Sequence, residues 1–260
     1  MMFKKKNYGS LIDGLWVTNT NLIDVINPFN QEIIGTVSDL GADGAVKAIL
    51  AAHEAFKSWS AETAEKRSDI LFNWFDLVKK NNDQIAEIIT LESGKPLKES
   101  YAEVDYAASF IKWFGEQAKR VDGSVLSSPD KRKKMLILKQ PIGVVSAITP
   151  WNFPIAMAAR KASAAIAAGC TVVLKPSELT PFTALKLAEL SIEAGLPSGV
   201  LNIVNGMPKP IGEVFSTHEL VKKVTFTGST KIGKYLMNNA SSSVKSVSLE
   251  LGGNAPFIIF

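Results

Sequence analysis

The sequence predicts an α/β protein built on a doubly wound, mostly parallel sheet from which a β-hairpin protrudes. Three observations support this prediction. Apolar strands alternate with helices over residues 142–260, an order typical of parallel β-α-β units. Helical periodicity dominates residues 43–120, and a polar, basic stretch with one short apolar run separates the two regions.

Short β-prone pieces begin the chain, and four helices follow them. Leu15–Val17 and Ile33–Val37 have strand composition and Asn27–Gln31 has that of a turn, so we expect strands of a small sheet here. From Asp43 onward the apolar residues repeat at helical spacing, interrupted by turn formers and by Pro96, which can open a helix. We expect helices over residues 43–59, 65–80, 82–92 and 97–120.

Residues 124–141 interrupt the helical region. Their basic turn and the apolar run Met135–Leu138 predict a β-hairpin that stands off the main body and suits an oligomer contact. Alternating elements follow it, with strands near 143–149, 171–175, 200–204, 223–227, 245–250 and 256–260 and helices near 154–168, 181–194, 208–217 and 230–240. The last apolar strand has no polar turn or cap after it, so we expect the chain to stop short of a further domain.

Composition and charge narrow the possible functions. The net charge of +4 is mildly basic, and the runs Lys4–Lys6 and Lys131–Lys134 have few aromatic neighbours, which favours solvated surface over a nucleic-acid site. No apolar run has the length of a membrane span, and no secretory signal is expected. The single cysteine, Cys170, excludes an internal disulfide and favours a reducing compartment, by default the cytoplasm. We expect no metal site.

Unusual residues follow the first two strands of the alternating region. Two prolines in Thr149–Pro154 fix the backbone and leave Asn152 projecting, either as a donor to an oxyanion that develops during reaction or as the cap of the next helix. Beyond the second strand, Lys175 and Glu178 can grip the hydroxyls of a ribose, or form a solvated ion pair. A carboxylate there would repel the extra phosphate of NADP, so Glu178 favours NAD.

The last two strands before residue 255 end in further candidates. Gly228 allows close approach of a ligand, and Ser229 begins a helix whose free N–H groups suit a pyrophosphate, although neither the Gly-x-Gly-x-x-Gly pattern nor a P-loop is present. Glu250 ends an apolar strand before Gly252 and Gly253. Such a glutamate is partly desolvated yet able to swing, as a general base acting through water requires, or it forms a structural ion pair.

In this order, the four motifs resemble those of the aldehyde dehydrogenase superfamily, from about residue 20 to the end. The resemblance implies a variant NAD-binding fold that lacks the usual glycine fingerprint. It implies that Asn152 donates to the thiohemiacetal oxyanion and that Glu250 activates water. It also implies that the cofactor-binding residues are Pro150, Trp151, Asn152, Lys175, Ser177, Glu178, Gly228, Ser229 and Leu251, with Lys175 and Glu178 on the adenosine ribose, Gly228 and Ser229 by the pyrophosphate and Leu251 near the nicotinamide.

A closer resemblance is to the succinate-semialdehyde dehydrogenases, which have stretches similar to 139–143, 162–170 and 250–257. That subfamily has an arginine on the helix after the Asn motif, here Arg160, whose guanidinium would bind the distal carboxylate of the substrate. The alternative is a surface arginine. The resemblance implies NAD-dependent oxidation of succinate semialdehyde to succinate by a homo-oligomer that uses the hairpin at 124–141 as its contact arm.

The sequence departs from the family at the nucleophile. Family members carry the nucleophilic cysteine in a Gly-Gln-x-Cys-like segment of a separate catalytic domain, and these 260 residues contain no such segment. Cys170 has no basic or cationic neighbour in sequence, so we expect an inert core cysteine. The predicted organisation is N-terminal strands and helices (1–123), an oligomerisation hairpin (124–141) and a β-α-β core (142–260), without a catalytic domain. Such a chain binds NAD but does not oxidise aldehydes alone. The alternatives are a non-catalytic nucleotide-binding or interaction module, and an enzyme for another aldehyde.

Overall fold

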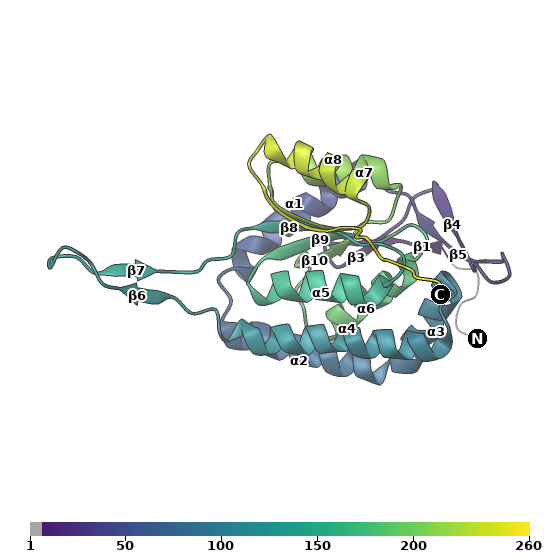
Figure 1. Ribbon diagram of the computed structural model, residues 1–260, viewed down its shortest axis with the longest axis horizontal. Helices are drawn as coiled ribbons and strands as arrows, with labels where there is room; N and C mark the ends of the chain where they lie inside the picture. The colour runs from purple at the N-terminus through teal and green to yellow at the C-terminus, as the bar shows by residue number, and fades with distance from the viewer. Residues whose placement is uncertain (1–6) are drawn as a thin grey trace.

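A seven-stranded sheet forms the centre of the protein in the computed structural model, which describes residues 7–260 (Figure 1). The basic run Lys4–Lys6 lies outside the described residues. In order across the sheet the strands are β12 (Ser246–Glu250), β11 (Val221–Thr227), β8 (Val144–Ile148), β9 (Thr171–Lys175), β10 (Leu201–Ile203), β2 (Ser10–Ile12) and β3 (Leu15–Val17). The strands from β12 to β10 are mutually parallel, which confirms the doubly wound, mostly parallel fold.

Helices cover both faces of the sheet. On one face lie α1 (Gly41–Trp59), α7 (Pro208–Thr217) and α8 (Thr230–Ser241), and on the other lie α5 (Pro154–Ala167) and α6 (Pro181–Glu193). A further layer outside α5 and α6 consists of α2 (Ala64–Lys80), α3 (Asn82–Ser93) and α4 (Leu97–Ala118). The helices predicted from the apolar period are therefore confirmed, each within about two residues at its ends.

The core lies between these layers and explains why the central strands are continuously apolar. Every residue of β9 is buried, because α1 covers one face of the strand and α5 the other. Small side chains line the buried side of α5, and Ala158, Ala159 and Ala162 are all fully buried. The absence of large side chains at these positions lets α5 lie close to the sheet and to α4.

The chain reverses its direction of travel across the sheet next to β8. It runs from β8 through β9 to β10 and then returns, so that β11 pairs with the opposite side of β8. Ligands of doubly wound sheets bind outside the carboxyl ends of the strands at such a switch point. This topology therefore predicts a ligand-binding site at the loops that follow β8 and β11.

The N-terminal strands divide between two sheets, which corrects one prediction. β4 (Leu22–Ile26) and β5 (Ile33–Ser38) pair across the predicted turn and, with β1 (Asn7–Tyr8), form a separate three-stranded sheet. Leu15–Val17 instead joins the main sheet, because its hairpin partner β2 pairs with β10. The backbone N–H of Asp13 also donates to Oδ1 of Asn202 at 2.9 Å, across 189 residues of chain.

The strand predicted at 256–260 is absent. Residues 251–260 have no regular secondary structure, and Phe257–Phe260 have exposed fractions between 70% and 113%. An apolar run becomes a strand only when a neighbouring strand accepts its backbone hydrogen bonds, and no strand within residues 7–260 pairs with it.

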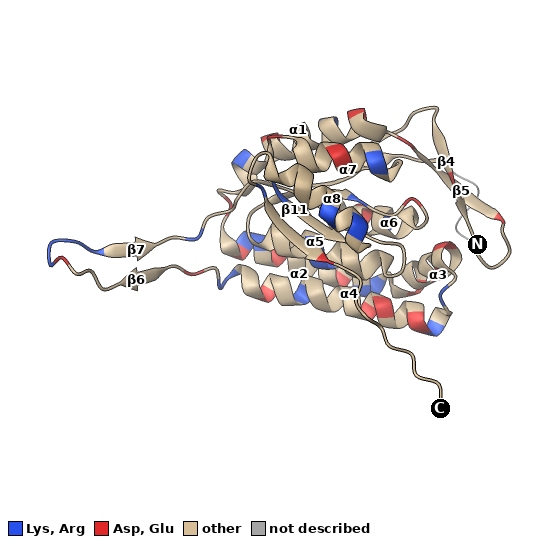
Figure 2. Ribbon diagram, turned by 45° about the horizontal axis from the view of Figure 1, so that its top comes forward, with Lys and Arg blue, Asp and Glu red and all other residues tan. Residues whose placement is uncertain are grey.

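The hairpin prediction is confirmed. β6 (Ser124–Leu126) pairs antiparallel with β7 (Met135–Ile137), and the two strands extend away from the body with basic residues at the tip (Figure 2). The apolar side chains of the hairpin are exposed, as at Val125 (73%) and Leu136 (67%). Elsewhere within residues 7–260, none of the helices combines the length and the apolar character needed to cross a membrane.

Candidate functional site

The four motif-bearing strands are neighbours and end at the same edge of the sheet. β12, β11, β8 and β9 lie side by side and run parallel. Their last residues are also in register, since Ile148 is opposite Lys175 and Phe226, and Thr227 is opposite Glu250. The loops after these strands therefore converge around the switch point between β8 and β11.

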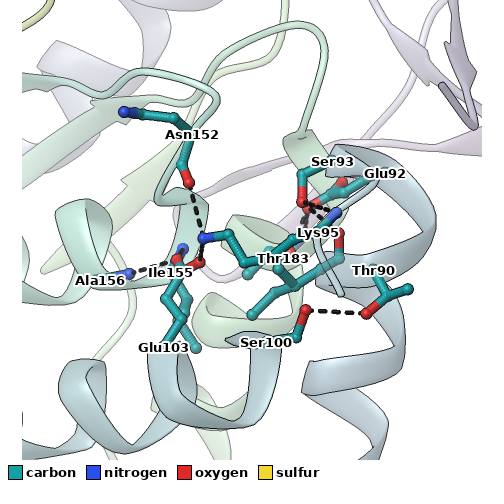
Figure 3. A network of polar contacts seen from close by, with 11 residues as sticks. Thr90, Glu92, Ser93, Lys95, Ser100, Glu103, Asn152, Ile155, Ala156 and Thr183 are labelled. Atoms are coloured by element: carbon teal, nitrogen blue, oxygen red, sulfur yellow. Dashed lines mark hydrogen bonds and ion pairs between the residues drawn. The ribbon is translucent and has the colours of Figure 1, made fainter. Parts of the chain in front are cut away.

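Asn152 lies in the loop between β8 and α5 with its side chain exposed. Phe153 is the N-cap residue of α5, and no side chain caps the helix from that position. The side chain of Asn152 points away from the neighbouring Lys95, whereas its backbone carbonyl points toward it (Figure 3). The helix-cap interpretation of Asn152 is therefore wrong, and its carboxamide N–H is available as a donor. Trp151 beside it is also exposed, and Pro150 is half-buried.

Lys175 and Glu178 form a partly buried ion pair at the end of β9. The distance from Nζ of Lys175 to Oε2 of Glu178 is 2.7 Å, and the two side chains are 2% and 29% exposed. Burial lowers the pKa of Lys175, and the charge of Glu178 opposes this effect. The ammonium keeps two further N–H donors for a ligand. Nearby, the Ser177 hydroxyl accepts a hydrogen bond from the Leu179 backbone at 3.2 Å and holds the loop.

The loop after β11 contains Gly228, where no other residue fits, and leads into the exposed N-terminus of α8. A Cβ on Gly228 would lie 2.5 Å from the ring of Phe226, so a side chain cannot be accommodated there without movement. Ser229 caps α8 by accepting from the Ile232 N–H at 3.4 Å, and the first turn of α8 is exposed. The hydroxyls of Thr149 and Thr227 are buried and have no hydrogen-bond partner within residues 7–260. Such orphaned hydroxyls beside the switch point suit a polar ligand.

Glu250 lies beside a hollow of about 410 Å³ between α5 and the sheet, together with Arg160 and Lys161. Glu250 is exposed, so the partial desolvation predicted for it is wrong; β12 is an edge strand and the residues after it are uncovered. Arg160 is half-buried, with its guanidinium 5.8 Å from the Phe110 ring centre. The structure thus brings Arg160 and Glu250 to one surface, while Asn152 lies outside that hollow.

Lys161 is a candidate that sequence reasoning missed. It is 7% exposed, and its Nζ donates to the Thr225 hydroxyl at 3.0 Å. Burial lowers its pKa to about 8; the charge of Arg160 adds to this effect and that of Glu250 opposes it. An amine with such a pKa can gain or lose a proton near neutral pH, next to the predicted base. The sequence resemblance assigns a function to the adjacent Arg160 and none to Lys161. Only the fold shows that Lys161 faces the sheet.

Cys170 is a free, buried cysteine with 4% exposure, in agreement with a core position. It precedes β9 at the amino end, whereas Asn152 follows β8 at the carboxyl end. A five-residue strand separates these edges, a length of about 16 Å. Cys170 is therefore poorly placed to act with Asn152. Among residues 7–260, no group of three or more His, Cys, Asp or Glu side chains could hold a metal ion.

Comparison with known proteins gives consistent matches. The family model described as "Aldehyde dehydrogenase family" matches residues 16–260. The chain is 51% identical over 253 residues to the NADP-dependent succinate-semialdehyde dehydrogenase of Escherichia coli, covering 96% of this chain and 52% of that protein. It is 49% identical over 261 residues to the glutarate-semialdehyde dehydrogenase of Pseudomonas aeruginosa, covering 100% and 53%.

A solved structure agrees with the fold. The betaine aldehyde dehydrogenase of Staphylococcus aureus in complex with NAD⁺ superposes with a TM-score of 0.92 at 42% identity, covering 95% of this chain and 50% of that one. The chain spans about half the length of the curated relatives it matches.

Proposed function

Because this chain belongs to the aldehyde dehydrogenase family, we propose that it supplies the cofactor site, the oxyanion donor and the general base of an NAD(P)-dependent semialdehyde dehydrogenase. The observation that carries the proposal is the convergence of four motif loops at the switch point of the sheet. An unrelated dinucleotide-binding module would not need a projecting carboxamide at Asn152 after one of these strands and a carboxylate at Glu250 at the end of another.

The reaction would divide between this chain and a cysteine thiolate that these residues do not supply. The thiolate attacks the aldehyde carbon, and the Asn152 N–H donates to the oxyanion that forms. The nicotinamide cofactor, when bound, accepts the hydride that leaves this carbon. Glu250 then removes a proton from water, which attacks the thioester and releases the carboxylic acid and the thiolate. A Cβ at Gly252 or Gly253 would have no atom of residues 7–260 within 4 Å, which leaves room for the Glu250 side chain to move toward the water.

The residues at the strand ends fit a dinucleotide. Lys175 and Glu178 would bind the ribose hydroxyls, and the exposed first turn of α8 after Gly228 and Ser229 would face the pyrophosphate. Pro150, Trp151, Ser177 and Leu251 would complete the site. We propose NAD over NADP because the Glu178 carboxylate would repel a 2′-phosphate, although the E. coli relative is named for NADP. Titration of the chain with each nucleotide, followed by Trp fluorescence, tests this preference; tighter binding of NADP would reverse it.

Arg160 supports a substrate with a carboxylate at the end opposite its aldehyde, as in the semialdehydes for which the relatives are named. In an enzyme acting on succinate semialdehyde, Arg160→Met should raise KM for that substrate at least about 10-fold. It should leave KM for propanal within about two-fold, because propanal has no carboxylate for Arg160 to bind. Arg120→Met, at an exposed position, is the matched control. Equal effects on both aldehydes would show that Arg160 does not read the carboxylate.

The function itself is tested in a full-length enzyme made by fusing the chain to the second half of the E. coli relative. We expect NADH formation with succinate semialdehyde and its loss in Glu250→Gln. Nucleotide binding without oxidation would favour the non-catalytic module instead.

We also propose that the hairpin at 124–141 joins subunits. The cytoplasm stays a prediction, since other relatives at about 50% identity are named mitochondrial.

A further inference from the structure

Lys95 lies in the short connection between α3 and α4, and this connection is fixed on both sides. Gly94 ends α3 in the left-handed conformation with a φ of 72°, and a Cβ there would meet a proline ring at 2.8 Å. Pro96 is the N-cap residue of α4. The hydroxyls of Thr90 and Ser100, 2.9 Å apart, join the two helices (Figure 3). Lys95 therefore projects from a well-defined backbone.

The Lys95 ammonium contacts three groups, of which Figure 3 shows the Asn152 carbonyl and the Glu103 carboxylate. Nζ donates to the carbonyl oxygen of Asn152 at 2.9 Å and pairs with the carboxylate of Glu103. It also lies 4.0 Å from the centre of the Phe153 ring, a favourable cation–π distance. The side chains of Lys95 and Glu103 are only 13% and 1% exposed, so water competes little for the ion pair, whereas the bond to the Asn152 carbonyl lies at the surface.

Glu103 fixes the other side of the same loop. Its Oε1 accepts hydrogen bonds from the backbone N–H groups of Ile155 and Ala156 at 3.1 and 3.3 Å. These are first-turn groups of α5 that the helix itself cannot satisfy, and the N-cap residue Phe153 provides no side-chain acceptor. The Lys95–Glu103 pair thus holds the backbone before Phe153 through a carbonyl and after it through two N–H groups.

The position of the Asn152 carboxamide depends on this backbone. No described residue accepts a hydrogen bond from the carboxamide, and the side chain is exposed and directed away from the ion pair (Figure 3). A donor to an oxyanion has to be held within about 0.5 Å of its working position. Because no hydrogen bond from residues 7–260 holds the carboxamide, the backbone must supply that precision.

We propose that Lys95 and Glu103 are positioning residues that hold the Asn152 backbone so that its carboxamide N–H meets the oxyanion. This inference rests on the proposed function. Neither residue touches the reacting atoms; both act through Asn152.

A double-mutant cycle between Lys95 and Asn152 in the full-length enzyme tests the inference. Lys95→Met should lower kcat about 10- to 100-fold, because the loop that carries Asn152 moves. It should leave the Kd for NAD within about two-fold, because the loop that carries Lys175 and Glu178 does not move. In the Asn152→Ala background the same substitution should lower kcat less than about two-fold, since no donor is left to misplace. Lys95→Arg should recover most of the wild-type kcat.

Lys79→Met is the matched control, because the exposed Lys79–Asp105 pair joins α2 to α4 without contacting the loop. It should leave kcat unchanged in both backgrounds. Equal kcat losses from Lys95→Met with and without Asn152 would overturn the inference and indicate a general structural role. If Lys95→Met does not fold, Lys95→Gln enters the same cycle, because its shorter side chain keeps a donor for the buried Glu103 carboxylate but does not reach the Asn152 carbonyl.

Amide hydrogen exchange on the 260-residue chain separates this inference from the proposed function. Lys95→Met should speed exchange at Ile155 and Ala156 about 10-fold or more, while Lys79→Met should not. Unchanged exchange would overturn the positioning role whatever the enzyme does. Failure of the wild-type full-length enzyme to oxidise any aldehyde, with the exchange result as expected, would overturn the proposed function instead.

Discussion

The starts of α5 and α6 present the same structural problem and answer it with different chemistry. Each helix begins with a proline after a residue that offers no side-chain cap, and each follows a loop of the candidate site. In each case a glutamate from the outer helical layer accepts two backbone N–H groups, Glu103 from Ile155 and Ala156 and Glu92 from Phe182 and Thr183.

The difference lies in the charge that faces each glutamate. Glu103 has the Lys95 ammonium as its partner, whereas within residues 7–260 Glu92 has only the hydroxyl of Thr183 besides the backbone groups. Burial raises the pKa of Glu92 to about 8, against the hydrogen bonds from Thr183 and Phe182. The Asn152 loop is therefore held by a charged pair, and the loop that carries Lys175 and Glu178 is held by a carboxyl group that can keep its proton at neutral pH.

The largest expected effect is on the free energy of unfolding when each of the two glutamates is replaced by glutamine. At pH 7, Glu103→Gln should lower the free energy of unfolding by about 3 kcal/mol, because Lys95 is left without its countercharge in a largely buried position. Glu92→Gln should lower it by only about 1 kcal/mol, since the carboxyl group it replaces is mostly uncharged, although the amide can accept only one of the two backbone N–H bonds. Urea unfolding measures both, with the exposed Glu99→Gln as control. Equal losses at the two positions would remove the distinction.

The second prediction concerns pH. The folded-state pKa of Glu92 is about 8, above its usual value of 4.5, so the folded protein keeps a proton that the unfolded chain releases. The stability from this group is complete below pH 4.5 and is lost as pH rises toward 8. Relative to Glu92→Gln, the wild type should lose about 2 kcal/mol between pH 6 and 8.

Unfolding free energies measured at pH 6, 7 and 8 test this loss as a difference between the two proteins, which cancels the titration of other groups such as Lys161. Parallel curves would show that Glu92 is ionised in the folded state. The comparison with Glu103 would then lose its electrostatic basis.

The smallest effect is expected at Thr183. Thr183→Val removes the hydroxyl that donates to Glu92 and should cost about 1 kcal/mol. The pKa of Glu92 should rise further, because that hydrogen bond lowers it. Carboxyl ¹³C NMR gives the titration midpoint, and Thr217→Val is the control, because the exposed Thr217 hydroxyl donates to the backbone carbonyl of Glu213 and not to a carboxyl group. A midpoint that stays in place or falls would show that the hydroxyl does not stabilise the ionised carboxylate.

The sequence predicted what local periodicity and strand-end chemistry encode. The apolar residues of the outer helices repeat at helical spacing, a pattern that can be read without knowing the helix neighbours. The motif strands have functional residues at their ends, and parallel pairing brings these ends together. Predictions failed where a distant partner decides the outcome. Leu15–Val17 joined the main sheet through β10, and residues 256–260 found no strand to pair with.

The same dependence on distant parts of the chain explains why the sequence did not indicate Glu92, Glu103 and Lys161. Glu92 and Glu103 look like polar positions on amphipathic helices, and their partners lie 90 and 52 residues away. Only the stacking of the outer helices on α5 and α6 reveals them as caps. Lys161 was missed because its helix is rich in small residues, and periodicity did not indicate which side faces the sheet.

The long-range pairing of β2 with β10 also has a consequence for synthesis. Asp13 and Asn202 are 189 residues apart, and translation adds roughly 5–20 residues per second. The β2–β3 hairpin therefore waits roughly 10–40 s on the ribosome before its partner strand emerges. Each of its strands is only three residues long, which limits the backbone edge open to wrong pairing during that interval.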